Sequence, residues 1–282
     1  MFNRRFFGFG CSYTKYEYPT WADIIGSNFK EYFNFGQAGC SNFYIFTAIT
    51  EAHKKFKFTK NDLVIVEWTD EFRKDMFNNQ NWCLQLHNDR DYSSNYLDLY
   101  GLYLETMTYM SSVQEWLDSI GIEYYFIQMN LLSHTSKIPT SHSHKLKHYE
   151  LNKPYPLNIP LPFVAPENFY KTTIDKLYPA IDEFLGEGCK NRPIYFRKLK
   201  IEDGHPMPWQ YYDYVKHFFP QFMLNDFNLR NHLMDVFEIF LRQKIQLKQE
   251  FEPNTINWPV EISILDQKYA LTTLYNLIEK ND

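Results

Sequence analysis

The segment DLVIVEW at residues 62–68 constrains the fold most strongly, because it is an apolar run between two polar segments. Such a run is typical of a strand in a parallel sheet whose two faces are both covered by helices. Similar apolar runs predict further strands over residues 5–9, 32–35 and 122–129. Apolar residues at helical spacing predict helices over residues 21–29, 43–55 and 97–119.

Strand, turn and helix alternate in this way, which predicts a three-layer α/β/α fold with a central, mostly parallel sheet. We therefore expect an α/β domain over residues 1–220 and a helical C-terminal appendage over residues 221–282. Within the domain, residues 130–167 are rich in Pro, Ser, His and Lys and predict a lid-like insertion. The other expectations are irregular structure at 74–95 and 186–208 and helices at 168–185 and 211–219.

Charge and hydropathy argue against two classes of partner. The chain carries 29 basic and 34 acidic residues, for a formal net charge of -5, so we expect no nucleic-acid partner. It has no apolar run long enough to span a bilayer and no signal-peptide pattern at its start, so we expect no membrane partner.

Its 4 cysteines show neither metal-type nor disulfide-type spacing. A reducing compartment follows, and we expect a cytoplasmic location, which for a viral protein is the host cytoplasm.

Aromatic residues make up 19% of the chain, with 22 Tyr, 25 Phe and 6 Trp. Tyr and Trp can line a pocket for a sugar or an acyl chain, but aromatic side chains are also ordinary core and interface material. We expect the core to account for most of them.

Polar turns follow three of the predicted strands, after Phe9, Phe35 and Trp68. Because active sites in parallel sheets lie at the carboxyl ends of the strands, we expect these turns to share one edge. In the first turn, GFGCSYT, Ser12 follows Gly10 and can present its hydroxyl at that edge as a nucleophile. The alternative is that Ser12 caps a helix, which is a common role for serine.

The second turn, NFGQAGCSN, contains two closely spaced glycines, Gly36 and Gly39. Such glycines allow backbone N–H groups to turn toward a ligand, as an oxyanion hole requires. A tight turn without a function would have the same sequence.

The segment EDGHP places two acids close to His205. A carboxylate beside an imidazole can fix the tautomer of the ring and raise its basicity. In an extended segment Asp203 would share a face with His205, whereas in a helical turn Glu202 would be its partner. Gly204 and Pro206 disfavour a helix, so we favour Asp203 and keep Glu202 as the alternative.

Taken in order, GCSYT, NFGQAG, the apolar strand ending in a WT turn and the late DGHP resemble the SGNH/GDSL hydrolases over residues 4–220. They are most similar to members common in phages and bacteria that carry a GCSxT start, a WT turn and a DGHP ending. The resemblance implies an SGNH-hydrolase-like (flavodoxin-like) fold, with Ser12 as nucleophile and His205 as base. It also implies the N–H of Gly39 as an oxyanion donor and places Cys11 and Asn42 in the oxyanion or substrate-binding group.

The chain departs from the family pattern at two places. Members usually have a GxND turn after the third strand, whose Asn donates to the oxyanion, whereas this chain reads EWTDE and offers the hydroxyl of Thr69. Loss of one oxyanion donor typically costs about 10²–10³ in rate. The usual late spacing is Asp-x-x-His. Here Glu202 holds the acid position, and Asp203 has the spacing of acetyl-transferring relatives.

A histidine group invites a metal interpretation, and its members are His134, His142, His144 and His148. His144 and His148 would share one helix face, but the surrounding sequence has no acidic or Cys ligand and is rich in Lys, which opposes a cation. No phosphate-binding, dinucleotide-binding or zinc-finger motif occurs. We therefore predict no metal and no cofactor.

These features together predict a serine-dependent acyl-ester hydrolase, an esterase or deacetylase that acts on a small-molecule or glycan acyl ester. One alternative is an O-acetyltransferase, which would use Ser12 and His205 to pass the acyl group to a sugar hydroxyl. The other is a catalytically silent binding protein or virion-associated assembly protein on the same scaffold. The missing Asn and the helical tail favour this last alternative, and the joint presence of Ser12, Gly39 and His205 opposes it. The sequence does not indicate an oligomeric state.

Overall fold

The computed structural model describes residues 1–71, 73–78, 81–83, 99–130, 177–185, 194–196, 199–201, 205–223 and 228–251. Within these ranges the centre of the molecule is a five-stranded sheet with the order β2-β1-β3-β6-β7. Every pairing in this sheet is parallel. Its strands are β1 (Phe2–Gly10), β2 (Phe29–Gly36), β3 (Leu63–Trp68), β6 (Glu123–Gln128) and β7 (Leu177–Ala180).

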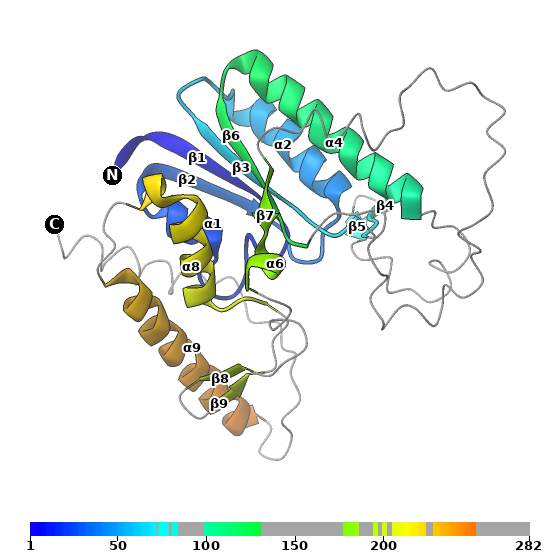
Figure 1. Ribbon diagram of the computed structural model, residues 1–282. Coiled ribbons are helices and arrows are strands. Elements are labelled where there is room, and N and C mark those ends of the chain that lie inside the picture. The colour runs from blue at the N-terminus through cyan, green and yellow to red at the C-terminus, as the bar shows by residue number, and fades with distance from the viewer. Residues whose placement is uncertain are drawn as a thin grey trace.

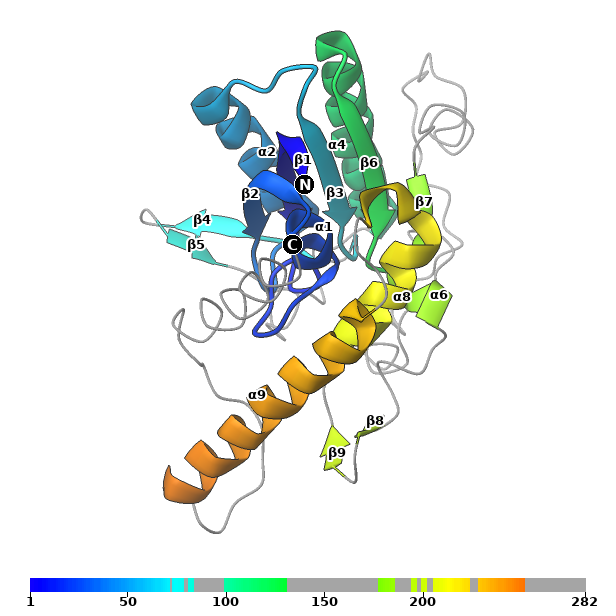
Figure 2. The same cartoon turned by 90° about the vertical axis from the view of Figure 1, so that its left-hand side faces the viewer.

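Helices cover both faces of the sheet (Figures 1 and 2). On one face α2 contacts α4, and on the other α1 contacts α8. The helices are α1 (Trp21–Gly26), α2 (Asn42–Phe56), α4 (Leu99–Ile120), α6 (Ile181–Leu185), α8 (Pro208–Phe218) and α9 (Leu229–Phe251), with a short 3₁₀ turn, η2 (Pro220–Phe222). The predicted three-layer α/β/α fold with a parallel central sheet is therefore confirmed.

Aromatic side chains stack across neighbouring strands of the sheet. Phe7 of β1 lies opposite Phe33 of β2, and their rings stack with centroids 5.0 Å apart. Phe9 and Phe35 form the next such pair on that face, at 5.1 Å. Stacked aromatic pairs across strands stabilise the fold beyond the burial of their area.

The helix predicted over residues 21–29 is too long. It ends at Gly26, and Phe29 instead begins β2. The Phe29 ring packs against the rings of Phe2 and Phe6, at centroid distances of 4.9 and 5.3 Å. Pairing with β1 therefore decides the conformation of Phe29, although its spacing from the preceding apolar residues is helical.

The helix predicted over residues 168–185 is wrong over residues 177–180, which form β7, and is confirmed over residues 181–185, which form α6. β7 lies at the edge of the sheet and pairs with β6, with Leu177 opposite Phe126. An edge strand tolerates Pro179, which cannot donate a ladder hydrogen bond. Local periodicity does not reveal a pairing between residues this far apart.

Two segments that we predicted to be irregular contain short antiparallel hairpins. Their strands are β4 (Met76–Asn78) with β5 (Asn81–Cys83), and β8 (Ile194–Phe196) with β9 (Leu199–Ile201). Strands of this length carry too few residues for a recognisable alternation of apolar and polar side chains.

Helix α9 supplies the described part of the predicted C-terminal appendage. Leu233 and Phe237 are buried, and the Phe237 ring lies 5.5 Å from that of Trp209 in α8. Residues 252–282 and, except for Asn130, the predicted lid at 130–167 lie outside the described residues, so the proposed domain division stays a prediction. No described helix combines the length and apolar character needed to cross a membrane.

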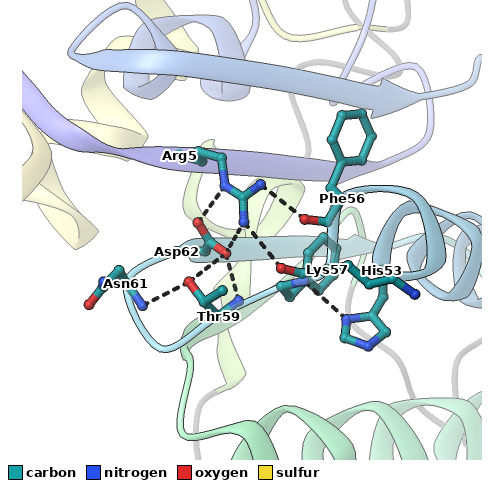
Figure 3. A network of polar contacts seen from close by, with 8 residues as sticks. Arg5, His53, Phe56, Lys57, Thr59, Asn61 and Asp62 are labelled. Atoms are coloured by element: carbon teal, nitrogen blue, oxygen red, sulfur yellow. Dashed lines mark hydrogen bonds and ion pairs between the residues drawn. The ribbon is translucent and has the colours of Figure 1, made fainter.

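An ion pair at the amino edge of the sheet ties β1 to β3 and to the end of α2 (Figure 3). The Arg5 guanidinium donates to both carboxylate oxygens of Asp62, from Nε at 2.8 Å and from Nη2 at 2.6 Å. It also donates to the backbone oxygen of Phe56 at 3.0 Å, so that the cation caps the carboxyl end of α2. Asp62 in turn accepts from the N–H of Thr59 at 2.7 Å.

We expect Asp62→Asn to lower the free energy of unfolding by about 2–3 kcal/mol, because hydrogen bonds to a charged group are lost while the cation stays in place. The Asp62 side chain is only 3% exposed, so water does not replace these bonds. Urea denaturation would measure the loss. The control is Arg242→Gln, which breaks an ion pair whose arginine is 73% exposed and should cost less than about 0.5 kcal/mol. Equal losses in the two variants would contradict the role given to Asp62.

Candidate active site

Ser12 lies in a tight turn directly after β1. The N–H groups of Thr14 and Lys15 both donate to the backbone oxygen of Cys11, at 3.1 Å each, and close the turn. Gly10, the last residue of β1, has a φ of +156°, and a Cβ at this position would collide with the side chains of Thr14 and Glu67. The chain can therefore leave the sheet this sharply because residue 10 is glycine.

The structure does not support the alternative that Ser12 caps a helix. The first helix, α1, begins at Trp21 and its N-cap residue is Thr20. The Ser12 hydroxyl instead lies 2.8 Å from Nε2 of His205. The Ser12 residue is 5% exposed, and His205 is half-buried just before α8. Tertiary structure thus joins a hydroxyl and an imidazole that are 193 residues apart in the chain.

Two tyrosines that the sequence analysis did not single out enclose the His205 ring. Tyr16 stacks on it with centroids 4.0 Å apart and an interplanar angle of 23°. Tyr13 lies at 5.5 Å in a tilted arrangement, and its hydroxyl donates to Asp182 of α6 at 2.9 Å. Tyr13 belongs to the same turn as Ser12 and Tyr16 directly follows it, so this short segment carries the hydroxyl and also packs against the imidazole.

A buried carboxyl group underlies the Ser12 turn. Glu67, near the end of β3, accepts hydrogen bonds from the Thr14 hydroxyl and, at 3.1 Å, from the Cys11 thiol. Burial raises the pKa of Glu67 above its ordinary value, although the two hydrogen bonds act in the opposite direction. An acid inside the apolar run DLVIVEW is the signal in the sequence that could have revealed this group.

Cys11 is part of this buried cluster and faces away from solvent. Burial and the neighbouring Glu67 carboxyl raise the pKa of its thiol to about 12. Its sulfur also lies 3.5 Å from the sulfur of Met129. A thiol that keeps its proton is a poor nucleophile, so Cys11 does not compete with Ser12. Its contacts are internal, and they do not support the predicted substrate-binding role of this side chain.

Asn42 and Thr69 bind each other, which differs from the expectation that they bind an oxyanion or a substrate. The Asn42 amide accepts from the Thr69 N–H at 2.8 Å and donates to the Thr69 backbone oxygen at 3.0 Å. It also donates to the hydroxyl of Thr106 at 3.1 Å. The Thr69 hydroxyl is buried and lies 3.6 Å from the Met129 sulfur. These side chains therefore hold α2, α4 and the end of β3 together.

The Gly39 turn lies beside the Ser12 turn. The N–H of Gln37 donates to the Gly10 oxygen at 2.9 Å, and the Cys40 thiol contacts the same oxygen at 3.4 Å. Gly39 has a φ of +76°, in the left-handed region that favours glycine. Within the described part of the chain, the N–H groups of Ser12 and Gly39 donate to no other residue. Both are thus available as donors to a bound oxygen.

Two expectations about the site fall on residues outside the described ranges. Asp203 and Glu202 lie outside the described residues, so the acid that orients His205 stays a prediction. The histidines of the 134–148 segment also lie outside them. Among the residues that are described, no cluster of His, Cys, Asp and Glu could hold a metal ion.

A hollow of about 270 Å³ lies beside Arg5 and Asp62, at the opposite edge of the sheet from Ser12.

A scan against models of known protein families finds no match, and a search of curated proteins finds no significant match either. The resemblance to the SGNH/GDSL hydrolases therefore rests on the motifs of this chain. The 2.8 Å contact between Ser12 and His205 does not depend on that resemblance.

We expect Glu67→Gln to become more stable relative to the wild type as the pH rises. Burial raises the folded-state pKa of Glu67, so the folded protein keeps a proton that the unfolded chain releases above its ordinary value of 4.5. This stabilisation is complete below about pH 4.5 and is lost as the pH rises through the folded-state pKa, whereas glutamine has no proton to lose.

Urea denaturation of the wild type and the variant between pH 4 and pH 9 would measure this difference. The control is Glu51→Gln, which removes a glutamate from the exposed side of α2. A difference in unfolding free energy between Glu67→Gln and wild type that stays constant over this range would show that the Glu67 carboxyl is not held protonated by burial.

Proposed function

We propose that this protein is a serine-dependent acyl-ester hydrolase of the SGNH/GDSL type, an esterase or deacetylase. The observation that carries the proposal is the 2.8 Å contact between the Ser12 hydroxyl and Nε2 of His205 at the carboxyl edge of a parallel sheet. This is the reach that a base needs to take a proton from a nucleophile. The carboxyl edge is also where α/β folds bind their ligands.

The proposed reaction begins when Nε2 of His205 takes the proton from Ser12 and the Ser12 oxygen attacks the ester carbonyl. The N–H groups of Ser12 and Gly39 donate to the oxyanion of the tetrahedral intermediate. The His205 imidazolium then gives its proton to the leaving alcohol, and an acyl-enzyme remains. Water, deprotonated by His205, attacks this acyl group, and the returning proton restores the Ser12 hydroxyl.

The stack of Tyr16 on His205 supports the same mechanism. A ring held at 4.0 Å keeps the imidazole plane fixed, so that Nε2 stays directed at Ser12. A catalytically silent scaffold protein would have no need for this arrangement, so the stack weighs against the assembly-protein alternative.

We expect a fluorophosphonate probe to label wild-type protein at Ser12 and to leave Ser12→Ala unlabelled, because the probe reacts with serines activated by a base. His205→Ala should slow labelling at least ~10²-fold, which is the usual contribution of a general base. Ser119→Ala, which removes an exposed serine of α4, is the matched control and should label like wild type. Labelling that survives Ser12→Ala, or none in folded wild type, would refute the enzyme proposal.

The choice between the two acids near His205 gives a further prediction. We expect Asp203→Asn to lose up to ~10⁴ in turnover, as loss of the orienting acid does in serine proteases, and Glu202→Gln to lose little. The reason is that Gly204 and Pro206 favour an extended segment, in which Asp203 and His205 share a face. Turnover of an activated ester by the two variants would measure the ranking. The reverse ranking would indicate a helical turn and the usual family spacing.

A further inference from the structure

Arg73 lies at the same edge of the sheet as Ser12 and is not used by the proposed mechanism. Its backbone N–H donates to the Asp70 oxygen at 3.2 Å, which closes the turn that follows β3. The residue is half-buried, and its guanidinium reaches back over the sheet edge. There Nη1 lies 3.4 Å from the backbone oxygen of Cys40, and Nη2 lies 3.5 Å from the sulfur of Met129.

These contacts place the guanidinium between the oxyanion turn and the end of β6. Cys40 directly follows Gly39, the predicted oxyanion donor. The Met129 sulfur is also 3.5 Å from the thiol of Cys11, the residue before Ser12. The cation therefore contacts the oxyanion turn directly, and the Met129 sulfur lies between it and the residue before Ser12.

The described residues near the Arg73 guanidinium balance its positive charge only weakly. A carbonyl at 3.4 Å and a thioether at 3.5 Å are neutral acceptors beyond the ordinary hydrogen-bond distance. None of the ion pairs of the described residues includes Arg73, although Asp70 and Glu67 attract it through space. The nearby thiols of Cys11 and Cys40 keep their protons because burial raises their pKa.

A partly buried guanidinium normally pairs with a carboxylate or phosphate, because its planar set of donors matches two oxygens at once. We propose that Arg73 binds a carboxylate carried by the ester substrate, a few bonds away from the carbonyl that Ser12 attacks. The proposal rests on the proposed hydrolase function and narrows its substrate class to anionic esters. Arg73 is then a specificity-determining residue, and the oxyanion itself is bound by backbone N–H groups.

The test compares esters that differ in a carboxylate. One pair is 4-nitrophenyl butyrate and the 4-nitrophenyl monoester of succinic acid, with the charge on the acyl side. The other is phenyl acetate and 4-acetoxybenzoate, with the charge on the leaving group. Arg73→Gln should lower kcat/KM for the carboxylate ester of at least one pair by about 10- to 100-fold, the value of a hydrogen-bonded charge pair. For the neutral esters the change should stay below about threefold.

Two further variants serve as controls. Arg73→Lys keeps the charge but not the two-pronged geometry, and it should retain part of the preference for the carboxylate ester. Arg242→Gln removes an arginine from the exposed face of α9 and should leave all four reactions unchanged. Equal losses on neutral and carboxylate esters in Arg73→Gln would overturn the proposal, because they would indicate a role at the oxyanion or in folding. No loss on either would overturn it as well.

A binding measurement separates this proposal from the proposed function. Calorimetry with succinate and 4-hydroxybenzoate would use Ser12→Ala protein with and without Arg73→Gln. Binding of either anion that disappears with Arg73→Gln supports the anion site even if wild type hydrolyses none of the four esters, a result that would refute the hydrolase proposal alone. If neither anion binds and no carboxylate ester is preferred, the Arg73 proposal is wrong whatever the hydrolase activity.

Discussion

The parallel pairing of β1 with both β2 and β3 is the constraint on which the rest of the structure depends. In this register Gly10 lies opposite Gly36, and Phe9 lies opposite Val66, so the strands end at nearly the same level. A shift of one residue would turn the stacked phenylalanines to the other face of the sheet, at the cost of buried aromatic contacts. The side chains that fix the register therefore also bring the turns after these strands together.

Hydrogen bonds from buried polar groups fix the turns at the carboxyl ends of these strands. Glu67 accepts hydrogen bonds from Cys11 and Thr14 of the Ser12 turn, and Asn42 accepts one from the backbone N–H of Thr69, just after β3. Each makes several hydrogen bonds, so moving either would leave buried polar groups unsatisfied. The ion pair of Arg5 and Asp62 lies at the opposite edge (Figure 3). This ion pair thus lies apart from Ser12 and His205, and a stability variant can be made without touching the candidate site.

Burial also sets the charges around Ser12. Burial raises the pKa of both Glu67 and Cys11, which favours the neutral form of each group where it touches the nucleophile turn. A negative charge there would oppose the oxyanion that the proposed reaction forms, whereas the guanidinium of Arg73 favours an anion nearby. The proposed nucleophile, its base and the cation thus share an edge where burial disfavours a negative charge on Glu67 and on Cys11.

The sequence by itself determined the layers and the main strands, because a buried parallel strand needs an apolar run such as residues 62–68 and glycine is needed where the chain turns at Gly10. It did not determine the conformation of Phe29 or of residues 177–180, since pairing with distant strands overrode their helical spacing. The sequence also suggested Asn42 and Thr69 as ligand-binding groups. In the structure these residues bind each other, and a motif could not show this because it does not reveal which polar atoms are already paired. The resemblance to the SGNH/GDSL hydrolases predicted that Ser12 and His205 act together. Only the tertiary structure decided that their side chains lie 2.8 Å apart and that Tyr16 stacks on the ring, because these contacts join segments that no local pattern relates.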